Sequence, residues 1–72
     1  MSVSKVMKAL DLLQKLEMSN KRMSVAMDDF ITSYKTKDGK VIDEARQKMH
    51  DQLDSHLDIM AECAMVKEEI RG

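Results

Sequence analysis

The sequence predicts an all-α protein made of two long antiparallel helices, a helical hairpin that we expect to dimerise into a four-helix bundle. Three observations predict this fold. The 72 residues include no proline and only one Phe and one Tyr, with 43% apolar and 35% charged residues, which favours helices over strands. One obvious turn signal, Lys37-Asp38-Gly39-Lys40, interrupts the chain. Apolar residues recur at helical spacing on both sides of that turn.

Length and composition also exclude several classes of protein. We expect a single domain over residues 1–72, because the chain is well below the ~150 residues of an average domain. Cys63 has no second cysteine to pair with, so a disulfide scaffold is excluded and a cytoplasmic location is expected. From this sequence we expect no membrane-spanning segment and no secretory signal. Residues 1–40 carry a net charge of +3 and residues 41–72 a net charge of −4, so the two halves attract each other.

The first helix is expected over about 3–35, with Ser2 or Ser4 as its N-cap. Its apolar residues follow a seven-residue repeat, which is typical of helices that pack side by side. One row of this repeat, the a positions, consists of Val6, Leu13, Asn20, Met27 and Tyr34, and the d positions are Ala9, Leu16, Met23 and Phe30.

A turn is expected over about 36–40, with Gly39 taking the positive φ that a tight reversal needs. An alternative interpretation remains for residues 31–42, where β-branched residues surround an Asp-Gly pair as they do in β-hairpins. We favour the helical connection, because an isolated two-stranded hairpin is marginally stable in water.

The second helix is expected over about 41–71, folded back so that facing residues have numbers that sum to 76. This pairing places Leu13 opposite Cys63 and Asn20 opposite His56. A polar layer of Asn20 and His56 inside an apolar seam would fix the register of the two helices. Alternatively, a histidine in that layer would make the pairing sensitive to pH.

Apolar residues on the flanks of this predicted seam would stay wet in a lone hairpin: Leu10, Leu12, Ile31, Leu57, Ile59 and Val66. Self-association into a four-helix bundle is the simplest way to cover them, and a different protein partner is the alternative. We therefore predict a protein-binding surface that also includes two methionines on the side away from the seam, with the candidate residues Met18, Met65, Leu12, Ile59 and Val66.

A second candidate site is a basic line of Lys8, Lys15 and Arg22, which recur every seven residues and would contact phosphates. A dimer of hairpins with such a line is similar in architecture to the plasmid repressor-of-primer proteins, which bind paired RNA. It is also similar in size and shape to small helical co-chaperones of secretion-needle subunits. Both likenesses concern architecture alone, and no residue role is taken from them.

Catalytic and metal chemistry are not expected. The cluster His50, Asp51, Asp54, His56 and Asp58 offers one weak chelating pair and is better explained as a solvated helix face. We expect no enzyme activity, no cofactor and no metal. The sequence instead favours a protein-protein interaction module, such as a small adaptor, assembly chaperone or inhibitor. The alternatives are a nucleic-acid-binding regulator and a structural subunit of a larger assembly.

Overall fold

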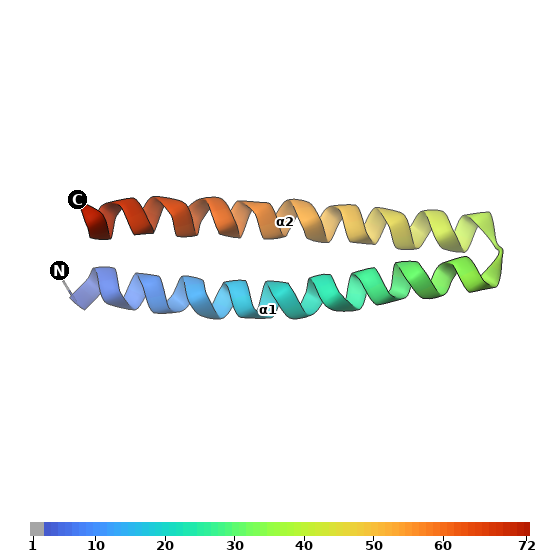
Figure 1. The fold of residues 1–72 in the computed structure, drawn as a ribbon, viewed down its shortest axis with the longest axis horizontal. Helices are drawn as coiled ribbons and strands as arrows, with labels where there is room; N and C mark the ends of the chain where they lie inside the picture. The colour runs from blue at the N-terminus through green and yellow to red at the C-terminus, as the bar shows by residue number, and fades with distance from the viewer. Residues whose placement is uncertain (1–2) are drawn as a thin grey trace.

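A computed structural model describes residues 3–72 and shows two helices side by side, joined by a short turn (Figure 1). Helix α1 spans Val3–Ser33, the 3-10 turn η1 spans Tyr34–Thr36, and helix α2 spans Gly39–Arg71. The predicted helical hairpin is confirmed. Residues 3–72 contain no strand, so the β-hairpin interpretation of residues 31–42 is wrong. The helical repeat simply continues from both sides into that segment.

Side chains of the turn hydrogen-bond the backbone at both helix ends. The Thr36 hydroxyl donates to the Ser33 carbonyl oxygen at 2.6 Å and accepts from the Asp38 backbone N–H at 3.2 Å. Asp38 is the N-cap of α2, where its carboxylate accepts from the Lys40 N–H at 3.0 Å. These bonds satisfy backbone groups that have no partner inside a helix, so the reversal is closely specified.

The positive φ of the turn lies at Lys37 (φ 56°, ψ 20°), not at Gly39. The expectation for Gly39 is therefore wrong, because this glycine is already the first residue of α2. The reversal takes place one residue before the Asp38 cap, at a position where the sequence carries a lysine.

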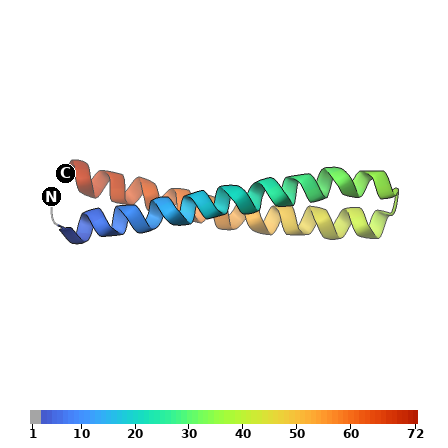
Figure 2. The same cartoon turned by 90° about the horizontal axis from the view of Figure 1, so that it is seen from below.

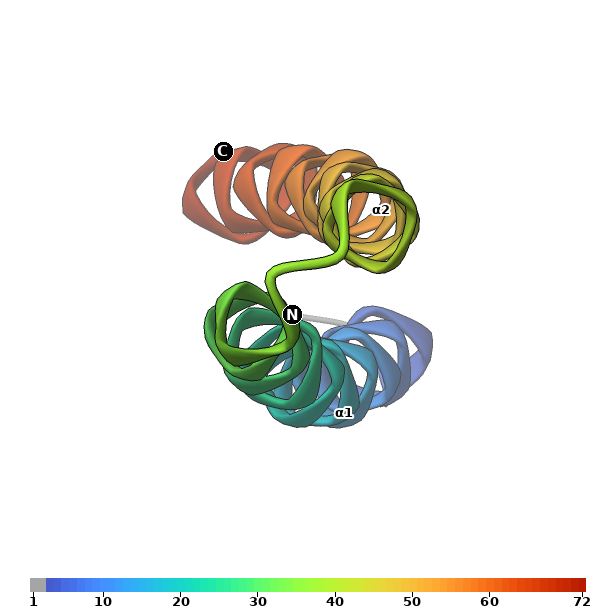
Figure 3. The ribbon, with the colours of Figure 1, turned by 90° about the vertical axis from the view of Figure 1, so that its right-hand side faces the viewer.

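The hairpin is long and thin. Its Cα extents are 54 × 14 × 12 Å and its radius of gyration is 16.4 Å, against about 11 Å for a compact domain of this length. Seen from below, the helices cross at a shallow angle (Figure 2), and the end-on view shows them winding around each other (Figure 3). The helices contact each other along a single seam, and the rest of each helix faces outward.

The seam uses two rows of residues from each helix, each repeating every seven residues. The buried or half-buried residues of α1 are Ala9, Leu12, Leu16, Ser19, Met23, Ala26, Phe30 and Ser33, and those of α2 are Ile42, Ala45, Met49, Gln52, His56, Ile59, Cys63 and Val66. The predicted row that begins with Ala9 is correct. The predicted row that begins with Val6 is wrong, because its members are exposed and the row that begins with Leu12 takes its place.

His56 lies in the seam, but its partner is Ser19 and not Asn20. The Ser19 Oγ lies 2.8 Å from the His56 Nδ1 and 3.5 Å from the Gln52 Nε2, which donates to it. Ser19 is 0% exposed, whereas Asn20 is exposed. The predicted Asn20–His56 layer is thus wrong by one residue, since a step of about 100° along a helix turns Asn20 out of the seam.

Candidate interaction surface

The seam divides the surface of the hairpin into two faces, and two contacts identify them. On one side, the Lys8 ammonium of α1 lies 3.9 Å from the Glu69 carboxylate of α2. On the other side, the Arg46 guanidinium lies 5.9 Å from the centre of the Phe30 ring. We call the Lys8 side the charged face and the Arg46 side the apolar face.

The apolar face carries large side chains that are each between 40% and 60% exposed: Val6, Leu10, Leu13, Met27 and Ile31 from α1, Tyr34 from η1, and Leu53, Leu57 and Met60 from α2. They follow the heptad rows next to the seam, so they form a band along the length of the hairpin. Polar residues interrupt the band, notably Glu17 and Asn20 near its middle. Both helices therefore contribute to one amphipathic surface.

A groove of about 380 Å³ lies on the apolar face near the ends of the chain. Its lining is mostly apolar and consists of Ala9, Leu12, Leu13, Cys63, Val66, Lys67, Ile70 and Arg71. A groove of this kind can receive an apolar side chain of another helix while Lys67 and Arg71 stay in contact with water. The free thiol of Cys63 is half-buried in its floor.

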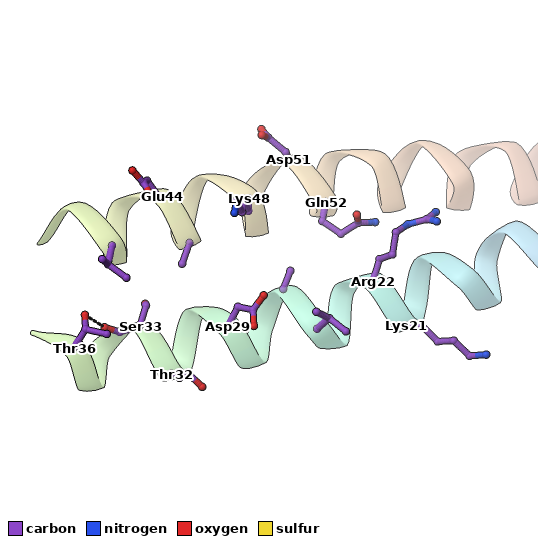
Figure 4. A pocket seen from close by; sticks show the side chains of 14 residues that line it. Lys21, Arg22, Asp29, Thr32, Ser33, Thr36, Glu44, Lys48, Asp51 and Gln52 are labelled. Carbon is purple, nitrogen blue, oxygen red and sulfur yellow. Dashed lines mark hydrogen bonds between the residues drawn. The ribbon is translucent and has the colours of Figure 1, made fainter. Parts of the chain in front are cut away.

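The charged face carries both signs of charge. A groove of about 830 Å³ runs along it near the turn, and its lining includes Arg22 and Asp29 of α1 and Lys48 and Gln52 of α2. In Figure 4, Arg22, Asp29 and Gln52 reach into this groove, while Glu44 and Asp51 point away from it. Cations and carboxylates alternate on this face, so it presents no continuous field of one sign.

The structure separates the predicted partner-binding residues. Met18 and Met65 are exposed, at 57% and 66%, but they lie on the charged face, so they are not part of the apolar face. Leu12 is 4% and Val66 is 5% exposed, and Ile59 is half-buried. These three residues pack α1 against α2, and Leu12 and Val66 also line the groove on the apolar face, so their contact with a partner stays a prediction.

Lys8, Lys15 and Arg22 are all exposed and lie along one edge of the charged face, as their spacing predicts. Lys8 is engaged by Glu69, and Asp29 continues the same row. The basic line is therefore present, with carboxylates beside it.

The histidines and carboxylates of α2 do not gather into a metal site. Among residues 3–72, no group of three or more His, Cys, Asp or Glu side chains is arranged to hold a metal ion. Within the same residues, neither helix has a stretch apolar enough to cross a lipid bilayer.

Sequence reasoning missed the apolar face as a single surface, although its main row was present in the repeat. Val6, Leu13, Met27 and Tyr34 were placed inside the hairpin because large apolar side chains suit a core. The fold thus defines an antiparallel helical hairpin with one apolar face. No protein-family model, no curated protein and no solved structure matches the chain.

Proposed function

We propose that this chain is a non-enzymatic protein-protein interaction module, acting as a small adaptor, assembly chaperone or inhibitor through its apolar face. The observation that supports the proposal is the band of large exposed side chains on both helices. Monomeric proteins rarely expose continuous apolar patches above a few hundred Å², and larger ones mark interaction sites. An amphipathic helix of a partner would lie along the band, with its apolar residues between those of α1 and α2.

The shape of the molecule favours binding over catalysis. Both grooves run along the outside of the helix pair, so a bound small molecule would stay in contact with water. The single cysteine suits a cytoplasmic protein, and that location is part of the proposal.

The test compares two doubly substituted chains that differ only in the face they alter. Leu13→Lys with Leu57→Lys changes the apolar face, and Met18→Lys with Met65→Lys changes the charged face; all four positions are exposed. Tagged wild-type chain and both variants are used for affinity capture from native lysate, and helicity is checked by circular dichroism. We expect a protein retained by the wild type and by the charged-face variant but lost by the apolar-face variant. Equal retention by both variants would refute the proposal.

Nucleic-acid binding through Lys8, Lys15 and Arg22 is the less supported proposal, because Glu62 and Glu69 lie on the same face. Its signature would be an affinity that falls steeply as salt rises, whereas binding through an apolar face changes much less. A structural role in a larger assembly would appear as association that continues beyond a small oligomer in light scattering.

A further inference from the structure

We infer that, in the absence of another partner, the apolar face is covered by a second copy of this chain, lying antiparallel with its turn at the opposite end. The two hairpins then form a four-helix bundle in which α1 packs on α1 and α2 packs on α2. This inference rests on the proposed function, since it names an occupant of the same face.

The exposed area is large enough for an interface of this size. The chain exposes 5637 Å², whereas a compact monomer of 8.3 kDa exposes about 4,600 Å². The excess of about 1,000 Å² is comparable to the ~800 Å² that each partner buries in a standard interface. One further hairpin, presenting the same band, is sufficient to cover it.

On the apolar face, the residues of the Val6 row are arranged symmetrically about Asn20: large apolar residues lie seven and fourteen residues before it and after it. A two-fold axis at the level of Asn20 brings together residues whose numbers sum to 40. It places Val6 against Tyr34 of the second copy and Leu13 against Met27. Asn20 then meets its own symmetry mate, and two amide side chains hydrogen-bond each other well. In the outer row of the same face the numbers sum to 41, so Leu10 lies opposite Ile31 of the second copy.

The edge of α2 matches under the same axis. Within one hairpin, the Ser19–His56 contact shows that residues of α1 and α2 lie at the same level along the axis when their numbers sum to 75. Ser55 is therefore level with Asn20. Residues of α2 whose numbers sum to 110 then face each other. Leu53 lies against Leu57 of the second copy, and the Asp43 carboxylate lies against the Lys67 ammonium. Met60 lies against His50, and Arg46 lies against Ala64. No apolar side chain of the band therefore faces a carboxylate, and the negative charge of Asp43 faces a positive one.

The other way to stack two such faces is with both turns at the same end, and it fits less well. In that arrangement α1 packs on α2 of the second copy, with residues whose numbers sum to about 75 opposite each other. Ile31 would then face Asp43, and Leu57 would face Glu17. Asp43 is paired with Arg46 at 2.9 Å and Glu17 with Lys21 at 3.9 Å, and an apolar side chain placed against either carboxylate desolvates that ion pair without adding an opposite charge. The antiparallel arrangement avoids both contacts.

Cysteine cross-linking tests the position of the two-fold axis. In a Cys63→Ala background, Asn20→Cys places two thiols on the axis, within the distance over which a disulfide forms. The matched control is Lys21→Cys, the neighbouring residue, whose side chain is 76% exposed and points away from both the seam and the apolar face. With oxidised glutathione at micromolar protein, we expect Asn20→Cys to form a covalent dimer about 100-fold faster than Lys21→Cys.

Sedimentation equilibrium of the unmodified chain completes the test. A folded monomer throughout the micromolar range would overturn the inference, while capture of another protein through the apolar face would still support the proposed function. A dimer in which Glu17→Cys of one chain links to Leu57→Cys of another, while Asn20→Cys does not link to itself, would overturn the antiparallel arrangement. A cross-linked Asn20→Cys dimer that captures no other protein would support the inference and refute the adaptor function.

Discussion

In the turn, the positive φ that suits glycine falls on Lys37, and Gly39 has an ordinary backbone conformation. Lys37 has φ 56°, a conformation that costs an L-residue about 1–2 kcal/mol, which glycine does not pay. Gly39 has no positive φ, and a Cβ added to it would meet nothing within 4 Å. Gly39 is therefore the first residue of α2, a position that does not need the backbone freedom of glycine.

Gly39→Ala is expected to raise the free energy of unfolding by about 0.4–1 kcal/mol, because alanine has less conformational freedom to lose on folding. Lys37→Gly is expected to raise it by up to about 1 kcal/mol, since the relief at φ 56° exceeds the added entropy cost. Urea unfolding at one fixed protein concentration measures both, with exposed Lys35→Ala as the control. A Gly39→Ala chain that unfolds at lower urea would contradict this reading of the turn.

Ser19 shows how little space the seam has at its centre, where it is fully buried beside His56. Ser19→Leu is expected to destabilise the chain by about 1–3 kcal/mol, because the larger side chain forces the helices apart. Ser19→Ala keeps the size and is expected to cost no more than about 1 kcal/mol, as the half-buried His56 retains access to water. Thermal unfolding distinguishes the two, with exposed Gln14→Leu as the control. If Ser19→Leu did not lower the unfolding temperature, the helices would not be in close contact at Ser19.

At the scale of the helices, the sequence is sufficient for their number, direction and approximate ends, because one turn signal separates two uninterrupted seven-residue repeats. It is not sufficient for their rotation about their own axes. The rows that begin with Val6, Ala9 and Leu12 share the same repeat, and the large members of the first row suggest a core. The seam uses the third row, with Ser19, Ala26 and Ser33, because small side chains let two helices approach closely.

Adjacent leucines test this rotation. Leu12→Ala is expected to lower the free energy of unfolding by about 2–5 kcal/mol at every protein concentration, because Leu12 is 4% exposed within the hairpin. Leu13 is 58% exposed, so Leu13→Ala is expected to lower the unfolding temperature at high concentration and much less on dilution. Calorimetry at two concentrations measures both effects. If both variants lost the same stability at both protein concentrations, the row that begins with Val6 would lie in the seam after all.

At the scale of the whole molecule, the hairpin buries little apolar surface for its length. Of its hydrophobic side chains in residues 3–72, only Leu12 and Val66 are buried, and the others are half-buried or exposed. Chains this small rarely obtain sufficient stability from one core without a further support. Association through the apolar face is the support that we propose.

The unfolding temperature of the unmodified chain is therefore expected to rise with protein concentration, since association stabilises the folded state by mass action. Calorimetry over a wide concentration range measures the rise. Leu13→Lys with Leu57→Lys is expected to abolish it, whereas Met18→Lys with Met65→Lys leaves it intact. An unfolding temperature that is independent of concentration would show that the hairpin is stable alone.

The N- and C-terminal ends of the described helices lie at the same end of the hairpin, 54 Å in length, with the turn at the other (Figure 1). In the antiparallel bundle the chain ends of one copy and those of the other point in opposite directions. The proposed dimer would then be a rigid spacer that holds the chain ends of the two copies apart by about the length of the bundle. Dyes near Lys5 and Glu68 of one chain should show strong energy transfer, and dyes at Lys5 of the two copies weak transfer. Strong transfer between the copies would place both turns at the same end.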